Sequence, residues 1–417
     1  MTLEDVTITE IGARGDGIAE TPKGRLYVPY AAPGERLRVR LGAPRGDGRA
    51  ATIDEILEPS PDRSDSACKH FGTCGGCTLQ HIASRAVADL KREFVTTALG
   101  RHGFEEAPVE PTITIPPGKR RRARFAFHPG RRPALGFNLP ASRKVLNIEE
   151  CPVLRPELAT LIGPLRTLCG SFGVLAKGAD LQVTLTASGI DLLVIPNRPA
   201  DPDLPAREAL AAFAEAQDLC RVSWQTGDDW EPIAARRPVT VSFASTPVAI
   251  PPTAFLQPNA EGEAAIVQSV TSALAEAAPA RIADLYAGCG ALTFPTAAIA
   301  PIHAVEGDAA MTDALRTAAH DRVSVSQRDL HRTPLSSQEL SAFDAVIFDP
   351  PRAGARPLAT ALAESSVATI AAVSCNPATL ARDLRILVDG GYRLERVTPI
   401  DQFPWSAHVE AVAILRR

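Results

Sequence analysis

The alternation of apolar and polar residues changes character twice along the chain. Near the start, four short stretches alternate between the two kinds of residue, with glycine or proline between them (residues 6–9, 25–29, 37–41 and 51–56). Short strands at regular spacing with such turns are typical of a small β-barrel. The pattern therefore predicts a barrel over residues 1–58, either an OB-like barrel that binds nucleic acid or a generic interaction module.

In the last third, short apolar stretches alternate with stretches of helical period. The apolar stretches cover residues 281–285, 302–306, 323–325, 345–348 and 367–373, and helical patterns cover 261–277 and 378–388. Such alternation predicts a parallel sheet with helices between its strands. The stretches 392–399 and 409–415 predict a closing antiparallel hairpin. Residues 251–417 are thus expected to form a Rossmann-like α/β domain with seven strands.

The middle of the chain, residues 59–250, is less regular. A Pro/Ser linker precedes it, residues 83–99 have a helical period, and residues 156–249 indicate mixed α/β structure without an evident chemical motif. The expected fold is therefore a multidomain α/β protein in three parts, with boundaries at 1–58, 59–250 and 251–417.

Acidic residues follow several predicted strands of the last third. Glu306, Asp329 and Asp349 stand where strands end, and carboxyl ends of parallel strands share one edge, where ligands bind. A turn with Gly288 and Gly290 follows the first strand, and an acid about 20 residues further on is the spacing of a ribose-binding carboxylate. The third glycine of the dinucleotide fingerprint is missing, which favours S-adenosylmethionine over NAD.

Cys375 lies between a predicted buried strand and a helix, in a Ser-Cys-Asn-Pro turn. This position suits a nucleophile at the edge of the sheet. A small buried thiol is the alternative, because free cysteines are among the most buried residues. Position alone does not separate the two interpretations.

Three further cysteines, Cys68, Cys74 and Cys77, form a C-x5-C-x2-C run, and Cys151 next to a proline is the best candidate for a fourth ligand. Structural zinc prefers two close pairs of ligands, and only one close pair is present. The spacing therefore favours an iron–sulfur cluster with a structural role.

Two histidines keep the zinc alternative open. His70 and His81 lie in the same region and are possible zinc ligands. Cys169 and Cys220 have apolar, helical surroundings and are expected in the core.

The composition limits the possible partners. The net charge is −4 and the isoelectric point about 6.1, so any basic surface must be local. Residues 119–124 are such a basic stretch, and phenylalanines interleave with the charges that follow, which favours RNA contact over a solvated charged face. No apolar run has the length of a membrane span and the N-terminus lacks signal-peptide features, so the cytoplasm is the expected compartment.

Three motifs of the last third together resemble the RNA 5-methyluridine methyltransferases of the TrmA/RumA type. They are Asp349-Pro-Pro-Arg-Ala-Gly, the segment Ser374–Asp383 and Phe403-Pro404 followed by His408-Val409-Glu410. The start of the chain, with Gly-Asp-Gly-Ile-Ala from Gly15, is similar to the TRAM domain. The resemblance covers nearly the whole chain.

The resemblance implies a mechanism in which Cys375 attacks carbon 6 of uracil and Glu410 removes the proton from carbon 5. It implies a 4Fe–4S cluster on the four cysteines named above. It also implies that S-adenosylmethionine binds at the residues that match the family's pocket, with Glu306 on the ribose and Asp329 near the adenine: Gln257, Tyr286, Gly288, Glu306, Asp329 and Asp349.

The branch of the family with a TRAM domain and a cluster implies 23S ribosomal RNA as the partner, in a loop or unfolded segment, with transfer RNA as the alternative. A monomer without protein partners is expected. Two other classes are the alternatives: an amino-methylating enzyme, which Arg352 and Cys375 oppose, and a non-catalytic RNA-binding protein. Only Ala291, where the family often has Asn, supports the latter.

Overall fold

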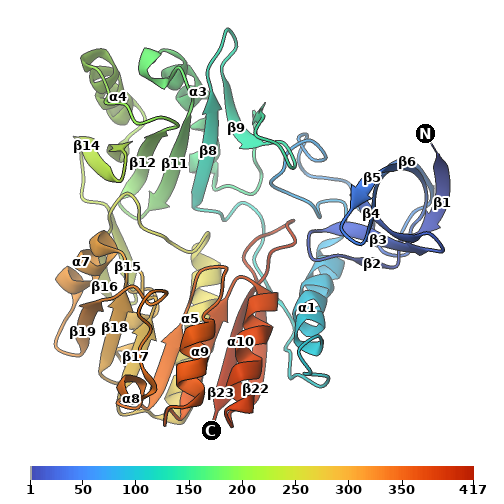
Figure 1. Cartoon of the computed structure of the whole chain (residues 1–417). Helices are drawn as coiled ribbons and strands as arrows, with labels where there is room; N and C mark the ends of the chain where they lie inside the picture. Colours follow the sequence, from blue (N-terminus) through green and yellow to red (C-terminus); the bar gives the residue numbers. More distant parts are fainter. Residues whose placement is uncertain (1) are drawn as a thin grey trace.

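The computed structural model describes residues 2–417 and contains three main sheets (Figure 1). A barrel-like sheet of six strands lies at the N-terminal end, a seven-stranded sheet lies in the middle, and an eight-stranded sheet contains the C-terminus. The mixed α/β class expected from the sequence is confirmed. No helix among residues 2–417 has the length and apolar content that a membrane crossing needs.

The first sheet curls on itself, with the strand order β1-β5-β6-β4-β3-β2 (Figure 1). Its interior is filled by alternate apolar residues such as Leu26, Val28, Leu37 and Val39. The strands β2 and β3 were not predicted, because glycines interrupt their apolar pattern. The six strands are β1 (Leu3–Thr7), β2 (Glu10–Ile11), β3 (Asp16–Thr21), β4 (Gly24–Pro29), β5 (Arg36–Arg45) and β6 (Gly48–Glu58).

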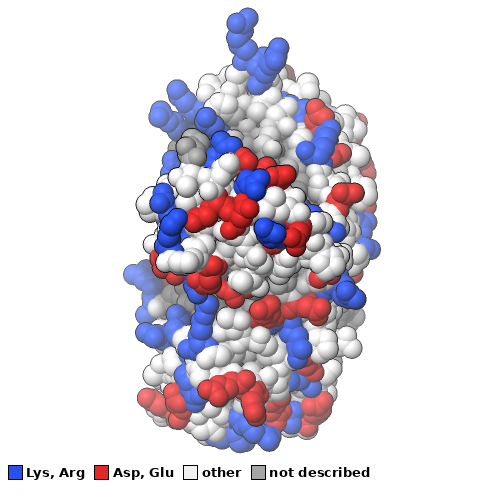
Figure 2. All heavy atoms as spheres, turned by 90° about the vertical axis from the view of Figure 1, so that its right-hand side faces the viewer, with Lys and Arg blue, Asp and Glu red and all other residues white. Residues whose placement is uncertain are grey.

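Charges of both signs intermingle on the face of the molecule that carries this barrel (Figure 2). The ion pairs explain the pattern, since Arg25 contacts Glu20 at 2.6 Å and Arg38 contacts Asp5 at 2.9 Å. Exposed pairs of this kind contribute little to stability. They do mean that these barrel arginines already have acidic partners.

The middle sheet has the order β10-β9-β8-β11-β12-β13-β14. On β8, Ala123, Phe125 and Phe127 are buried and the residues between them face outward, as the interleaved pattern predicted. Cys169 and Cys220 are buried as expected, although Cys220 lies on a strand rather than a helix. The elements are β8 (Arg122–His128), β9 (Ala134–Asn138), β10 (Val145–Asn147), α2 (Pro156–Ala159), α3 (Ile162–Gly170), η1 (Gly173–Leu175), β11 (Ala179–Thr186), β12 (Gly189–Pro196), α4 (Leu204–Ala216), β13 (Leu219–Thr226) and β14 (Asp229–Ala235).

The last sheet has the order β19-β18-β17-β20-β21-β23-β22-β7. Only β23 is antiparallel to its neighbours, which gives the expected closing hairpin with β22. The helix α5 and part of α7 pack on one face, and α1, α9 and α10 pack on the other. The elements are β17 (Ile282–Leu285), α6 (Thr293–Thr296), β18 (Ile302–Glu306), α7 (Ala309–Ala318), β19 (Val323–Gln327), α8 (Ser337–Leu340), β20 (Ala345–Phe348), α9 (Arg356–Ala363), β21 (Thr369–Ser374), α10 (Pro377–Asp389), β22 (Arg393–Asp401) and β23 (Glu410–Arg416), preceded by the hairpin β15 (Thr240–Phe243) and β16 (Thr246–Ala249) and by α5 (Ala260–Ala277).

The eighth strand comes from a distant part of the chain. β7 (Ile113–Thr114) pairs in parallel with the end of β22, with Ile113 opposite Ile400. The helix α1 (Ser84–Gly100) precedes it and contributes Val95 and Leu99 to the core beneath α9 and α10. Seven strands were expected, and the extra one was missed because a two-residue strand has no periodicity to detect.

Candidate active site

Cys375 directly follows β21, in which every residue is buried. Asn376 then caps α10, because its Oδ1 accepts a hydrogen bond from the Ala378 backbone N–H at 3.2 Å. Pro377 suits the first turn of a helix, since its φ is preset and no N–H is lost there. The turn therefore holds Cys375 at the carboxyl edge of the sheet, beside the positive end of a helix.

The same turn grips the segment Asp349–Gly354. Asn376 Nδ2 donates to the carbonyl oxygen of Arg352 at 3.0 Å, and Thr379 Oγ1 donates to the same oxygen at 3.3 Å. One turn later, Asp383 accepts the N–H of Ala355 at 2.7 Å. Two of the three motifs are therefore halves of one hydrogen-bonded unit.

The third motif supplies the partner of Cys375. The strands β21 and β23 are antiparallel and Ser374 pairs with Ala411, so the next positions outward are Cys375 and Glu410. Antiparallel neighbours that face each other point to the same side of a sheet. Glu410 is only 3% exposed, as the apolar flanks of its strand predicted. A thiol and a buried carboxyl thus stand side by side where the ladder opens.

Burial dominates the ionisation of this pair. It raises the pKa of Cys375, and the charges of Glu410 and Asp349 raise it further, whereas Arg352 lowers it. Burial also raises the pKa of Glu410 well above its usual range, and the charge of Asp349 adds to this, whereas a hydrogen bond from Gln402 and the charge of Arg352 oppose it. The thiolate of Cys375 is therefore favoured by Arg352, and the carboxylate of Glu410 by Gln402 and Arg352, against the effect of burial.

The glycine turn and the acid after the next strand form one unit. The Glu306 carboxylate accepts backbone N–H groups from Gly288 at 2.8 Å, Gly307 at 2.7 Å and Asp308 at 2.8 Å. Gly288 has a φ of 56°, which glycine adopts readily. A Cβ at this position would meet no atom within 4 Å, so open space lies against the turn. These features fit a ribose-containing ligand such as S-adenosylmethionine.

The other predicted cofactor residues lie at the same edge of the sheet. The ring centroids of Tyr286 and His331 are 5.4 Å apart. Asp329 Oδ1 accepts a hydrogen bond from the backbone N–H of His331 at 3.0 Å. Gln257 Nε2 donates to Asp349 Oδ2 at 3.2 Å. The helix that follows the glycine turn, α6, has only 4 residues.

A groove of about 490 Å³ leads from Cys375 toward the barrel. Its walls come from the barrel, from α1 and from the turns around Cys375 and His408. Cationic and aromatic side chains in such a groove suit a nucleic-acid strand. Those that line it are Tyr27, Phe94, Arg101 and Arg352, together with Arg25, which is already paired with Glu20. Two acidic residues, Glu10 and Glu93, also line the groove.

The basic stretch 119–124 is less available for contact with RNA than its sequence indicated. Arg121 pairs with Glu263 at 2.7 Å, and Arg124 pairs with Asp180 at 2.8 Å. The outward face of β8 carries Arg122 and Arg124, as predicted, but Arg124 is already paired within the protein, and so is Arg121 just before the strand.

The four predicted metal ligands line one cavity of about 450 Å³. Burial raises the pKa of Cys77 to about 12 and that of Cys151 to about 11. Cys74 and Cys68 complete the set, while His81 lies outside this cavity. Across residues 2–417, however, no three or more His, Cys, Asp or Glu side chains are arranged to hold a metal ion. The structure brings the four thiols together but not as a finished metal site.

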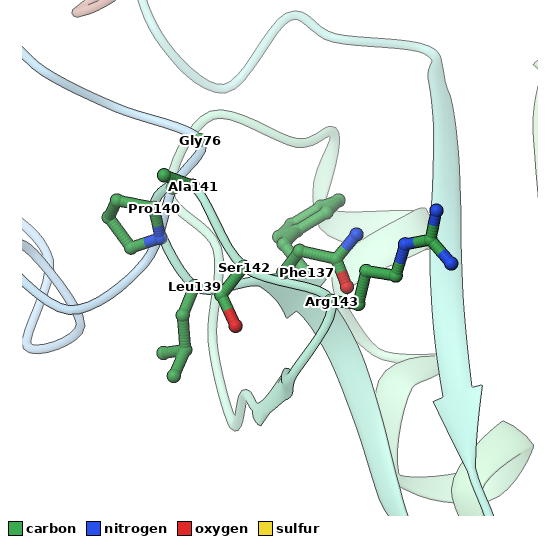
Figure 3. Close-up of a pocket in the computed structure, with 9 residues that line it drawn as sticks. Gly76, Phe137, Leu139, Pro140, Ala141, Ser142 and Arg143 are labelled. Carbon is green, nitrogen blue, oxygen red and sulfur yellow. The ribbon is translucent and has the colours of Figure 1, made fainter.

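The loop that carries three of these cysteines docks on the hairpin between β9 and β10. Figure 3 shows Gly76 beside Pro140 and Ala141 at the hairpin tip. The Gly75 N–H donates to the Asn138 carbonyl at 3.0 Å, and a Cβ on Gly75 would lie 2.7 Å from that oxygen. Gly75 is therefore needed for close contact with the hairpin, whereas a Cβ on Gly76 would meet only Cys74 Sγ, at 3.5 Å.

The sequence alone assigns no role to two residues of this region, His408 and Gln402. His408 Nε2 lies 3.1 Å from Arg352 Nη2, and both residues line the cysteine cavity as well as the groove of Cys375. Gln402 contacts Glu410 directly. His408 could have been found from its motif, whereas no spacing signal marks Gln402.

Comparison with known proteins identifies the family. The model of the tRNA (uracil-5-)-methyltransferase family matches residues 315–417. An uncharacterized RNA methyltransferase of Brucella melitensis is 43% identical over 421 residues, covering 99% of this chain and 97% of its own. The 23S rRNA (uracil(1939)-C(5))-methyltransferase RlmD of Chromohalobacter salexigens is 34% identical over 431 residues, covering 100% of this chain and 90% of its own.

A solved structure supports the same fold. The tRNA (uracil-54, C5)-methyltransferase of Pyrococcus abyssi, in complex with S-adenosyl-L-homocysteine, superposes with a TM-score of 0.76. It is 22% identical and covers 99% of this chain and 100% of its own. With the full-length relatives above, these findings show that the chain belongs to the RNA uracil-C5-methyltransferase family.

Proposed function

We propose that the protein methylates carbon 5 of a uridine in RNA through a covalent bond between Cys375 and carbon 6 of the base. The observation that carries this proposal is the juxtaposition of Cys375 and Glu410 at the open end of the β21–β23 ladder. A thiol next to a buried carboxyl provides a nucleophile and a base within reach of one substrate atom pair.

The residues act in sequence. The Cys375 thiolate forms a bond to carbon 6, and this makes carbon 5 nucleophilic. S-adenosylmethionine, which Glu306 and Gly288 would hold at this edge, would supply the methyl group to carbon 5, and the electron pair of the broken S–CH3 bond would stay on sulfur in the leaving S-adenosylhomocysteine. Glu410 then accepts the proton of carbon 5, the electron pair of that C–H bond forms the C5–C6 double bond, and the C6–S bond breaks to return the Cys375 thiolate.

The proposed substrate is 23S ribosomal RNA. The full-length relative whose name states a nucleotide is a 23S rRNA enzyme at 34% identity, whereas the tRNA enzyme of similar fold is 22% identical. A base that reaches Cys375 must leave its stack, which favours a loop or an unfolded segment. The groove along the barrel gives such a strand a path to the site.

Incubation with RNA that contains 5-fluorouridine tests the mechanism. Carbon 5 of this base carries fluorine in place of the hydrogen that Glu410 would remove as a proton, so the C6–S bond cannot break and the covalent complex persists. We expect an RNA adduct that survives denaturation and disappears in Cys375→Ala. Cys169→Ala, a buried cysteine far from the site, is the matched control and should form the adduct normally. An adduct that persists in Cys375→Ala would refute the proposal. Comparing 23S rRNA with transfer RNA as acceptors decides between the two substrates.

We further propose that Cys68, Cys74, Cys77 and Cys151 hold a 4Fe–4S cluster with a structural role. The support is their shared cavity and the preference of such clusters for four thiolates. A cluster of this kind would tie the loop before α1 to the segment after β10. Anaerobic purification with iron and sulfide analysis tests it: about four of each per chain are expected, fewer in Cys77→Ser, and stoichiometric zinc would contradict it.

The three proposed parts of the chain do not coincide with the three sheets, because α1 and β7 of the middle part pack with the last sheet. We propose that residues 1–58 form a TRAM-like barrel that contacts RNA, that 59–250 form a second RNA-binding part, and that 251–417 form the methyl-transfer part of a class I type. The proposal includes a monomer that acts in the cytoplasm. Light scattering of the free protein and of its RNA complex tests the monomer.

A further inference from the structure

Four buried side chains form a chain of hydrogen bonds between the cofactor edge and the base. Gln257 Nε2 donates to Asp349 Oδ2 at 3.2 Å. Gln402 Nε2 donates to Gln257 Oε1 at 2.8 Å and, with its second hydrogen, to Glu410 Oε2 at 2.8 Å. Two carboxyl groups are thus connected by two amides.

The hydrogen bonds of this series run from donor to acceptor in one direction, toward Asp349, up to Gln402. Asp349, when ionised, only accepts hydrogen bonds, so Gln257 must turn its NH2 toward it and its oxygen toward Gln402. Gln402 must then present its own NH2 to Gln257, and the remaining hydrogen points at Glu410. Burial raises the pKa of Asp349 to about 7, so this orientation of both amides belongs to the state in which Asp349 is ionised.

Gln402 is itself held firmly. It is 1% exposed, and its backbone carbonyl oxygen accepts a hydrogen bond from Asn259 Nδ2 at 2.8 Å. A Cβ on Gly262, in the first turn of α5, would lie 2.7 Å from the Gln402 side chain, so the absence of a side chain there makes the space for Gln402. Gln402 Oε1 and Glu410 Oε1 have no hydrogen-bond partner within residues 2–417.

We propose that Gln402 is the positioning residue of Glu410: it fixes Oε2 as a hydrogen-bond acceptor and leaves Oε1 as the atom that takes the proton from carbon 5 of uracil. This inference rests on the proposed function and adds to it the assignment of the reacting oxygen. Gln402 touches no substrate and acts only through Glu410.

The charges around Glu410 give the inference a measurable signature. Asp349 at the end of β20 disfavours the carboxylate form of Glu410, whereas Arg352 from the following loop favours it. Cys375 at the end of β21 is the third ionisable group that faces it. The Gln402 hydrogen bond also favours the carboxylate, so its removal raises the pKa of Glu410 further. A base must be ionised to act, so the acidic limb of the rate profile should move to higher pH.

The test compares Gln402→Leu and Gln402→Glu with the wild type and with Thr398→Val. Thr398 is a buried polar residue on β22 whose side chain hydrogen-bonds Glu110, and its strand partner on β23 is Val412 rather than Glu410. Both Gln402 variants should lose about tenfold in kcat, accumulate the methylated covalent RNA intermediate and shift the acidic limb upward. Thr398→Val should keep the wild-type profile.

Each outcome has a distinct meaning. If Gln402→Leu weakens S-adenosylmethionine binding more than tenfold without accumulating the intermediate, Gln402 serves the cofactor and the inference is wrong. A wild-type kcat and pH profile in both variants would also overturn it. A wild-type enzyme that never forms a covalent RNA intermediate would instead refute the proposed function. Gln402→Glu keeps the size of the side chain, so it remains informative if Gln402→Leu does not fold.

Discussion

A buried ion pair joins the N-terminal helix α1 to the last sheet, and its removal should be costly. The Lys91 side chain is fully buried, and its ammonium group donates to Asp401 Oδ1 and, at 2.9 Å, to the carbonyl of Phe403. Lys91→Met would leave Asp401 buried without its counter-charge. Breaking a buried pair in this way costs about 3–5 kcal/mol. The variant also loses two charge-assisted hydrogen bonds of about 1.5–3 kcal/mol each, and their sum agrees with this cost.

The matched control lies on the same helix. Arg85 pairs with Asp62 at 3.7 Å, but the Arg85 side chain is 88% exposed, so Arg85→Met should cost less than about 0.5 kcal/mol. Urea unfolding followed by far-UV circular dichroism compares the two. In the double variant Lys91→Met, Asp401→Asn, part of the loss should return, with a coupling of at least about 2 kcal/mol. A loss below about 1 kcal/mol in Lys91→Met would show that the pair is not the anchor described here.

Two further predictions concern the site. Burial raises the pKa of Cys375 above its ordinary value of 9.0, so the thiolate fraction is still growing at pH 8.5. Formation of the 5-fluorouridine adduct should therefore accelerate about tenfold per pH unit without a plateau, and a plateau below pH 8 would contradict this. Arg352→Met should slow adduct formation, because Arg352 lowers the pKa of Cys375. Gly354 has a φ of 78°, and a Cβ there would lie 2.6 Å from the buried Asp383 Oδ2 and 2.9 Å from Thr379 Cβ, so Gly354→Ala should cost about 2–4 kcal/mol in thermal unfolding. Gly103, with a φ of 80° and open space around it, is the control and should cost only about 1 kcal/mol when changed to Ala.

The sequence predicted well wherever the signal was local. The strands β18 and β20 have the bounds that their apolar runs predicted, and the helix at 378–388 was found to within one residue at either end. The acids Glu306 and Asp349 lie at the predicted edge because parallel strands that end together must place them there. Glu410 is buried because its strand is apolar on both faces.

What the sequence could not predict depends on partners chosen from far along the chain. Arg121 and Arg124 resemble free RNA-binding cations until Glu263 and Asp180 are placed beside them. Gln402 has no chemical mark of its own, since its importance arises from the two side chains that it connects. The four cysteines were predicted to share a site, but the pattern could not show how far apart their sulfur atoms would lie.

The contact between α1 and β22 also bears on how the protein is made. Lys91 and Asp401 are 310 residues apart, so at about 5–20 residues per second the ribosome finishes the second about 15–60 s after the first. During that time Val95 and Leu99 of α1 have no sheet to cover, and β7 has no strand to join. The apolar face of α1 therefore stays exposed until the last sheet has been synthesised, and the contact between α1 and β22 can form only near the end of translation.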